Sequence, residues 1–331
     1  LESGTKSLSR ALGTGHENAF VVFQKRMIEA YYEIDFMKKE AEYGFRLFSN
    51  PTKVKWLKQE EHRLIKKAKK NIEEFFKLDL KTLTDKELVA KLDYYIQAYQ
   101  EIYGFYHVTQ PQCFEKFNAR IQNQLTQYHL DALDIFLELS TPSEPSIIAQ
   151  EDMDRKKMFI SFLKGTKKEP LIQKHLQEYR FLSASEGVKP WNERDMLESF
   201  KHNTKDALTL EHELQNQMQF YPMLKKKQDE TIKKYKISKE LQEKFAVFRH
   251  FGNSRLLIRY YWCAMLRPYV MVADEIAERR NIAFPRFGDY TIKEVGEALL
   301  NGKMVSSKIL KERFDFGIVA LQNDKTVIMQ G

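Results

Sequence analysis

Glycine and proline are both scarce in this chain of 331 residues, with 13 and 9 copies. These counts are roughly half to two-thirds of the usual frequencies. Sheets and sandwiches need many turns, and turns draw on these two residues because glycine tolerates positive φ and proline presets φ. The shortage argues against a β-rich fold and favours long helices joined by few connections.

Cysteine is rarer still, with two copies, Cys113 and Cys263. Two cysteines so far apart build neither a disulfide framework nor a CxxC metal site. No run of about 18 apolar residues and no basic-then-apolar leader occurs. We therefore expect a cytoplasmic protein with no membrane partner. Residues 1–15 are small, polar and glycine-containing, and we expect them to form a flexible lead-in.

The common phosphate-binding and catalytic motifs are also missing from the sequence. It contains no GxxxxGK[ST], no strand followed by GxGxxG, no HExxH and no GxSxG. None of its 8 histidines stands three or four residues from another, and no Glu-x-x-His pair suits a di-metal bundle. We therefore expect no metal, no cofactor and no complete active site in this chain.

Apolar and charged residues, in contrast, are plentiful. Hydrophobic residues make up 43% of the chain, enough for a sizeable core, and 54 basic residues accompany 46 acidic ones for a net charge of +8. The basic runs are short, and Lys225–Lys227, for example, is followed by Asp229 and Glu230. Such alternation is typical of solvated helix faces, so nucleic-acid binding is only a distant alternative.

Hydrophobic residues recur at three- and four-residue steps, the period of an amphipathic helix. Capping boxes at Thr84–Glu87 and Thr291–Glu294 mark two helix starts, and Asn50 and Asn192 mark two more. The predicted helices are 17–47, 51–76, 84–103, 111–139, 146–163, 170–182, 192–200, 214–237 with a kink at Pro222, 238–280 and 291–300. Residues 314–321 and 326–329 are predicted strands.

These elements predict an all-α fold, a multi-helix bundle with a small C-terminal β appendage. The helical domain is expected over residues 16–313, with a sub-boundary near 140–146, where two prolines interrupt the chain. Residues 314–331 are the short β segment, which would lead towards a module that this chain lacks.

One candidate binding cluster lies on the predicted helix 238–280. Arg255, Arg259 and Trp262 fall on one helix face, and two guanidinium groups beside an indole suit a phosphate or carboxylate ligand. The alternative is that both arginines pair with glutamates of neighbouring helices.

A second candidate cluster follows the predicted helix 170–182. His175 and Tyr179 share a helix face, and Trp191 follows the next loop, so the three are candidates for a second wall of the same site. The alternative is a structural histidine that is hydrogen-bonded to a backbone carbonyl.

Several phrases then occur in an order that resembles a known family. They are Leu83-Thr84-Asp85-Lys86-Glu87-Leu88, the segment Ser140–Ser146, His175-Leu176-Gln177-Glu178-Tyr179-Arg180-Phe181-Leu182 with Pro190-Trp191, the segment Arg255–Trp262, and Asp289–Val295. Their order and spacing are similar to the helical middle region of phosphoenolpyruvate-synthase-like proteins, a group that includes the rifampin phosphotransferases. The resemblance covers roughly residues 80–331.

The resemblance implies a role in phosphoryl transfer. In such proteins an ATP-grasp domain phosphorylates a histidine on a swivelling carrier domain, which delivers the phosphoryl group to a substrate site. The resemblance implies that this chain is the helical acceptor-binding or docking domain. Its partners would be the carrier and the ATP-grasp domain, in one longer polypeptide or as separate chains, together with an anionic small molecule. The family's glycine-rich Thr/Ser-x-His segment has no match here, so a non-catalytic helical scaffold or regulator is the alternative.

Overall fold

The computed structural model describes residues 18–25, 27–126, 132–184, 189–282, 289–322 and 325–330. The chain divides into two compact units. The first unit comprises Leu1–Leu47, Lys55–Phe114 and Ala264–Gly331, and the second comprises Phe48–Val54 and Glu115–Cys263. The sub-boundary considered near 140–146 falls inside the second unit. The expected lead-in, 1–15, lies outside the described residues.

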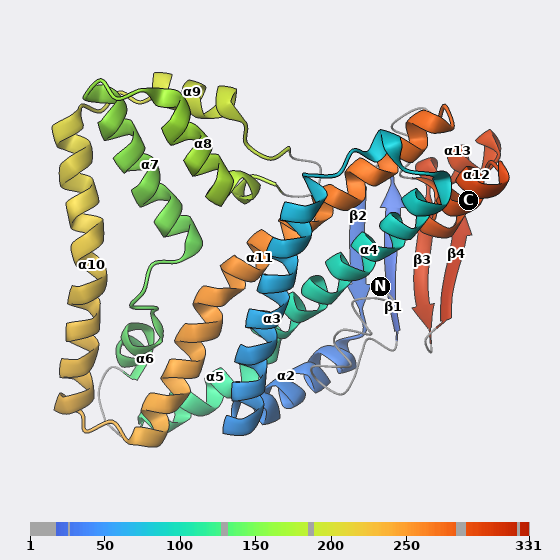
Figure 1. The fold of residues 1–331 in the computed structure, drawn as a ribbon. Helices are drawn as coiled ribbons and strands as arrows, with labels where there is room; N and C mark the ends of the chain where they lie inside the picture. Colours follow the sequence, from blue (N-terminus) through green and yellow to red (C-terminus); the bar gives the residue numbers. More distant parts are fainter. Residues whose placement is uncertain are drawn as a thin grey trace. The chain divides into compact units, whose positions relative to one another are not determined.

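Helix dominates the described chain, and a small sheet accompanies it, which confirms the predicted all-α bundle with a β appendage (Figure 1). The helices are α2 (Ile34–Phe48), α3 (Pro51–Phe75), η1 (Leu80–Thr82), α4 (Asp85–Val108), α5 (Pro111–Leu125), α6 (Ala132–Ser140), α7 (Ile147–Leu163), α8 (Lys168–Tyr179), η3 (Arg180–Leu182), α9 (Glu193–Lys201), α10 (Ala207–Lys234), α11 (Lys239–Arg279), α12 (Ile292–Asn301) and α13 (Ser307–Asp315). The strands are β1 (Asn18–Gln24), β2 (Met27–Tyr32), β3 (Gly317–Gln322) and β4 (Lys325–Gln330).

The capping boxes predicted at Thr84 and Thr291 are confirmed. At the start of α4, the Thr84 hydroxyl accepts from the Glu87 amide at 3.3 Å, and the Glu87 carboxylate accepts from the Thr84 amide at 2.8 Å. Thr291 and Glu294 form the same reciprocal pair at α12. Gly302 ends α12 at φ 66, a left-handed conformation that glycine adopts without a steric penalty.

Three helix predictions need correction. The structure describes the predicted helix 111–139 as α5 and α6, and residues 127–131 between them lie outside the description. Helix α10 begins at Ala207, seven residues before the predicted start, because Asp206 accepts from the Thr209 amide as an N-cap. Helix α13 was not predicted, although Ser306 caps it in the same way, and strand β3 therefore starts at Gly317.

The largest error concerns residues 17–47, which were predicted to form one helix. Residues 18–24 and 27–32 instead form two paired antiparallel strands, β1 and β2, and α2 starts at Ile34. The spacing of Phe20, Phe23 and Met27 fits a helix, but the segment is rich in β-branched and aromatic residues and pairs with β3 from the other end of the chain. The four antiparallel strands lie in the order β2-β1-β3-β4, so strand is not confined to the C-terminus.

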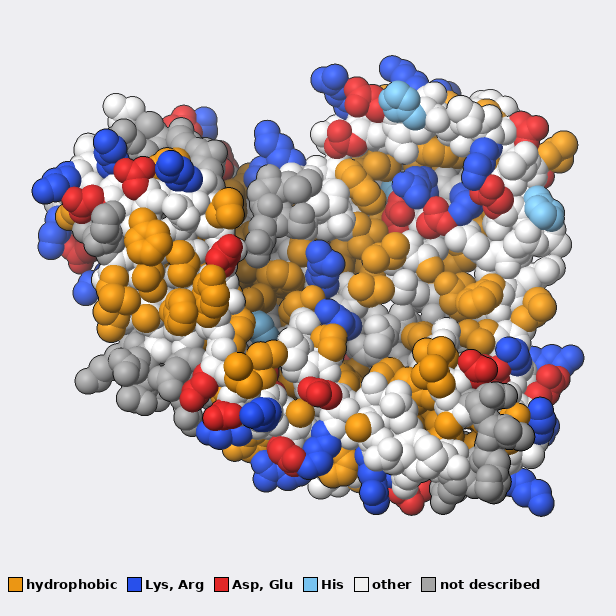
Figure 2. All heavy atoms as spheres, turned by 180° about the vertical axis from the view of Figure 1, so that it is seen from behind, with side chains coloured by type: hydrophobic (Ala, Val, Ile, Leu, Met, Phe, Trp, Pro, Cys, Tyr) orange, Lys and Arg blue, Asp and Glu red, His pale blue; other side chains and the backbone are white. Residues whose placement is uncertain are grey.

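Buried residues lie on one face of this sheet, whereas exposed apolar residues occur on both faces. Residues opposite each other in an antiparallel pair point to the same side. Ala19 and Leu321 are such a pair, and both are buried. The same side also carries Ile28 and Ile328, which are 59% and 42% exposed. On the opposite side Phe20 and Tyr31 are 43% and 44% exposed. Figure 2 views the molecule from behind and shows a gathering of hydrophobic side chains on its left. This corresponds to the right of Figure 1, where β3 and β4 lie.

An ion pair fixes the helices that precede β3. Arg313 of α13 donates to both carboxylate oxygens of Glu294 at 2.8 and 2.9 Å, and to the Asp289 carbonyl at 2.9 Å. These hydrogen bonds lower the pKa of Glu294 to about 2, although its partial burial opposes the shift. The Glu294 capping box and the Arg313 fork therefore hold α12 and α13 together.

Helices α7–α10 of the second unit pack around a core of their own. Its buried members are Met158, Phe159, Ile160, Phe162, Ile172, Leu176, Met196 and Leu210. Helix α7 lies against both α10 and α8, and α8 lies against α9. This core orients α8, the helix that carries His175 and Tyr179.

Candidate functional site

The candidate histidine lies between α7 and α8. His175 and Glu151 are 5% and 4% exposed, and His175 Nε2 is 3.1 Å from Glu151 Oε1. Arg155 Nε is 3.5 Å from the same oxygen. Loss of either partner would leave the other without compensation in the core.

Tyr179, one turn later on α8, also turns towards α7. Its hydroxyl donates to Asp154 Oδ2 at 2.7 Å, and burial together with this bond raises the pKa of Tyr179. The ring centroids of His175 and Tyr179 are 5.0 Å apart. The structure therefore brings these two candidates together, but their polar atoms point to carboxylates of α7.

A further polar cluster joins α7 to α10. Asp152 accepts from Gln217 Nε2 at 2.7 Å, from Arg155 at 3.0 Å and from Lys156. Burial disfavours the charged form of Asp152, but these bonds outweigh it and lower the pKa to about 2. The sequence did not indicate this cluster, because Asp152 and Gln217 are 65 residues apart.

Trp191 is half-buried and packs against the core of α7–α10. Its backbone amide donates to the Arg180 carbonyl at 2.9 Å, which brings the start of α9 back to the end of α8. The Trp191 indole therefore packs next to the last turn of α8.

The three candidates on α11 lie at different depths. Arg259 is exposed, whereas Arg255 and Trp262 are half-buried. Their neighbour Tyr260, which the sequence did not indicate, is 5% exposed, and its hydroxyl donates to the Glu178 carbonyl at 2.6 Å. The Tyr260 and Phe181 rings meet edge to face with centroids 6.1 Å apart. The middle of α11 thus meets the C-terminal end of α8.

A polar groove of about 470 Å³ runs along the other side of α8. It is lined by Pro170, Gln173, Lys174, Leu176, Gln177 and Arg180. Lys174 and Arg180 supply positive charge, and Gln173 and Gln177 supply amide donors. Gln173 Nε2 donates to Glu193 of α9 at 3.2 Å, so one carboxylate borders the groove. The spacing of these residues at helical steps is a sequence signal for this face, whereas the predicted site included only His175 and Tyr179 from α8.

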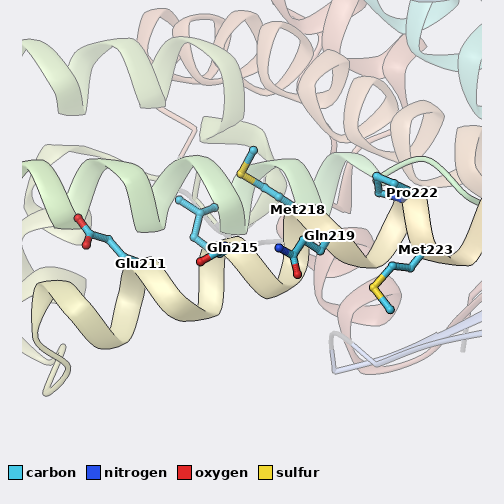
Figure 3. A pocket seen from close by; sticks show the side chains of 7 residues that line it. Glu211, Gln215, Met218, Gln219, Pro222 and Met223 are labelled. Atoms are coloured by element: carbon cyan, nitrogen blue, oxygen red, sulfur yellow. The ribbon is translucent and has the colours of Figure 1, made fainter.

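A second groove, of about 480 Å³, follows α10 and is mainly apolar (Figure 3). It is lined by Glu211, Leu214, Gln215, Met218, Gln219, Pro222 and Met223. Met218 and Met223 are 55% and 66% exposed. The groove contains no cation, so it does not suit the anionic ligand that the sequence predicts.

Within the part of the chain that the structure describes, no three His, Cys, Asp or Glu side chains are arranged to hold a metal ion. No helix among the same residues is both long and apolar enough to span a bilayer. Comparisons of the chain with protein-family models, with curated proteins and with solved structures gave no match.

Proposed function

We propose that this chain is the helical acceptor-binding and docking domain of a phosphoenolpyruvate-synthase-like phosphotransferase. In this proposal it acts in the cytoplasm with an ATP-grasp domain and a phosphohistidine carrier, which are parts of the same polypeptide or separate chains. The chain supplies the scaffold and the anion-binding groups, and the carrier supplies the phosphoryl group.

The observation that carries the proposal is a convergence of segments. Three of the phrases that resemble the family, 175–182, 190–191 and 255–262, meet at the C-terminal end of α8. Tyr260 donates to the Glu178 carbonyl at 2.6 Å, and the Trp191 amide donates to the Arg180 carbonyl at 2.9 Å. Segment 255–262 is distant in sequence from the other two, and its contact with them is expected if the shared phrases specify one functional region.

The α8 groove lies beside this convergence and has suitable chemistry. Transfer of a phosphoryl group requires positioning and neutralisation of negative charge. Lys174 and Arg180 provide two positive charges, and the neighbouring glutamines provide donors for phosphate or carboxylate oxygens. Arg259 is exposed on the adjacent α11 and is a third cation within this proposal.

We expect the groove to bind small anions that represent the phosphorylated carrier or the acceptor. Titration with inorganic phosphate and with phosphoenolpyruvate, followed by NMR, should shift the amides of α8. Lys174→Gln and Arg180→Gln should each weaken binding about tenfold, because a hydrogen bond to a charged group contributes about 1.5 kcal/mol.

A matched control is Arg194→Gln on α9, whose guanidinium pairs with Glu198 and whose side chain is 84% exposed. It removes the same charge outside the groove and should leave binding unchanged. Equal losses in all three variants would indicate a general charge effect, and no shift on α8 would remove the groove from the proposal.

The isolated chain is expected to be inactive with ATP. It has no phosphate-binding loop and no histidine that matches the carrier motif, so incubation with ATP and magnesium should give neither hydrolysis nor phosphorylation. Labelled ATP followed by mass spectrometry measures both. Stable labelling of any histidine would contradict the proposed division of labour.

The alternative of a non-catalytic scaffold is favoured by the satisfied polar groups of α7 and α8. His175 and Tyr179, two of the predicted binding residues, are held by Glu151 and Asp154. The coding sequence that follows this segment separates the two functions. A glycine-rich Thr/Ser-x-His segment there, or in an adjacent gene, supports the docking domain, and its absence supports the scaffold.

A further inference from the structure

The segment that joins α10 to α11, residues 233–239, carries four lysines and no acidic residue. We call it the basic turn, and it lies in the second unit, at the lower left of Figure 1. Its lysines are Lys233, Lys234, Lys236 and Lys239, and all of them are exposed. Within the described part of the chain, none of these lysines forms an ion pair.

The acidic residues on either side of the basic turn are paired with other lysines. These ion pairs are Lys225–Asp229 at 2.9 Å, Lys226–Glu230 at 3.9 Å and Lys244–Glu240 at 2.6 Å. Glu243, one turn further into α11, is exposed and is not paired with Lys239. The positive charge of the basic turn is therefore not neutralised by ion pairs with its described neighbours.

Helix stability does not account for all of these lysines. A cation in the last turn of α10 interacts favourably with the helix dipole, but the other two lysines are in unfavourable places. Lys236 adopts φ 49, and the Ile237 amide donates to the Ile232 carbonyl at 3.0 Å. This is the Schellman pattern, in which glycine is the usual left-handed residue. Lys239 is the first residue of α11, where a positive charge opposes the helix dipole.

We propose that the basic turn binds the phosphate backbone of a single-stranded nucleic acid. Lysines contact phosphates without reading the base sequence. Tyr235 stands among them, half-buried, with the Lys234 ammonium 4.8 Å from its ring centroid. Sites for single strands combine positive charge with aromatic side chains in this way. The mixed charges that argue against nucleic-acid binding at Lys225–Glu230 are absent from this segment.

The arrangement of the lysines distinguishes a single strand from other anionic partners. Lys233 and Lys234 leave α10 about 100° apart around its axis, and Lys239 belongs to another helix. A flexible strand can follow these different directions, whereas a flat membrane or a rigid duplex would meet only part of them.

The basic turn also lacks apolar contact area. Between Met223 and Ile292, none of the described residues is a large hydrophobic side chain that is exposed. A lipid surface or a specific protein interface would bury such side chains, whereas phosphate contacts do not need them. The inference is independent of the phosphotransferase assignment, because it uses none of the residues of α8.

Fluorescence anisotropy of a labelled oligothymidylate of about 20 nucleotides, titrated with the whole chain, tests this inference. Contacts from all the lysines of the basic turn predict that log K falls with log salt at a slope of about −3, roughly 0.7 for each contact. We expect a Kd on the order of 100 µM at about 150 mM salt and binding about 100-fold tighter at about 25 mM. Lys233→Gln should reduce the slope by about 0.7 and weaken binding about tenfold at the lower salt concentration.

Lys303→Gln is the matched control, because Lys303 is exposed in the first unit and its replacement removes the same charge. It should leave binding nearly unchanged. Lys236→Gly should weaken binding as Lys233→Gln does, but should raise the melting temperature, because glycine adopts the left-handed conformation without a steric penalty. That combination separates a lost phosphate contact from a lost fold.

Several outcomes would overturn the inference. They are no binding at about 25 mM salt up to about ten times the expected Kd, a slope near zero, and an equal loss in Lys233→Gln and Lys303→Gln. A duplex of the same length that binds as tightly as the oligothymidylate would reject the single strand as the partner. Binding to phosphatidylserine vesicles without binding to the oligothymidylate would identify a lipid surface instead.

Discussion

Replacing Gly44 by alanine is expected to destabilise the first unit by about 2–3 kcal/mol, although alanine is the better helix former. A Cβ on Gly44 would lie 2.7 Å from the carbonyl carbon of Cys113 and closer still to its oxygen. Both obstacles are backbone atoms at the start of α5, so no side-chain rotation relieves the overlap. Overpacking of this kind costs about 1–3 kcal/mol or more, which exceeds the gain of about 0.5–1 kcal/mol from replacing a helical glycine.

Gly252→Ala provides the matched control. Gly252 lies within α11, and an added Cβ would meet nothing within 4 Å. The helix-propensity gain therefore stands alone, and this variant should be about 0.5–1 kcal/mol more stable than the wild type. Urea unfolding followed by circular dichroism measures both changes. If the two variants shift in the same direction, the close contact between α2 and α5 does not decide the stability.

The second large effect concerns Glu40, which lies one helical turn before Gly44 and is 6% exposed. Burial raises its pKa to about 7. Its charge also contributes to the raised pKa of the Cys113 thiol, after burial, so the two groups are close. A carboxyl whose pKa is higher in the folded state contributes stability that is fully present below the unfolded pKa, about 4.5, and is lost as the pH rises through about 7. A displacement of this size corresponds to about 3 kcal/mol.

Glu40→Gln should therefore be about 2–3 kcal/mol more stable than the wild type at pH 8 and nearly equal to it at pH 4.5, since glutamine does not ionise. Glu42→Gln is the control, because Glu42 is exposed on the same helix and its replacement should change stability by less than about 0.5 kcal/mol. Urea unfolding at a series of pH values measures the difference. A constant difference between wild type and Glu40→Gln across this range would contradict the role of ionisation.

His107 imposes the opposite pH dependence. It is partly buried beside Tyr103, with ring centroids 4.6 Å apart, and burial lowers its pKa to about 4. The stability that neutral His107 contributes to the folded state is present above the unfolded pKa of 6.5 and is lost as the pH falls towards 4. Between about pH 4.5 and 6.5 the slopes from Glu40 and His107 oppose each other and nearly cancel. The Glu40→Gln variant should therefore gain stability as the pH rises through this window, while the wild type changes little.

Helical spacing in the sequence predicted only part of the candidate site. Spacing correctly placed His175 and Tyr179 on one face of α8, and their ring centroids are 5.0 Å apart. It did not indicate that α7, at Glu151 and Asp154, supplies their polar partners. The same spacing rule, applied to Gln173, Lys174 and Gln177, describes the opposite side of α8, where the polar groove lies. Which face is buried depends on the neighbouring helix, and that is not encoded within α8.

The sequence by itself determined the features that arise within one or two helical turns. The capping boxes at Thr84 and Thr291 and the left-handed stop at Gly302 join residues that are neighbours along the chain, so their chemistry is visible in the sequence. Tertiary structure alone decided that residues 18–24 form a strand, because their partner strand is residues 317–322. It also decided which polar groups of α7 and α8 are satisfied internally. Backbone pairing and burial depend on segments far apart in sequence, and a local pattern of apolar residues fits a helix or a strand until the partner is known.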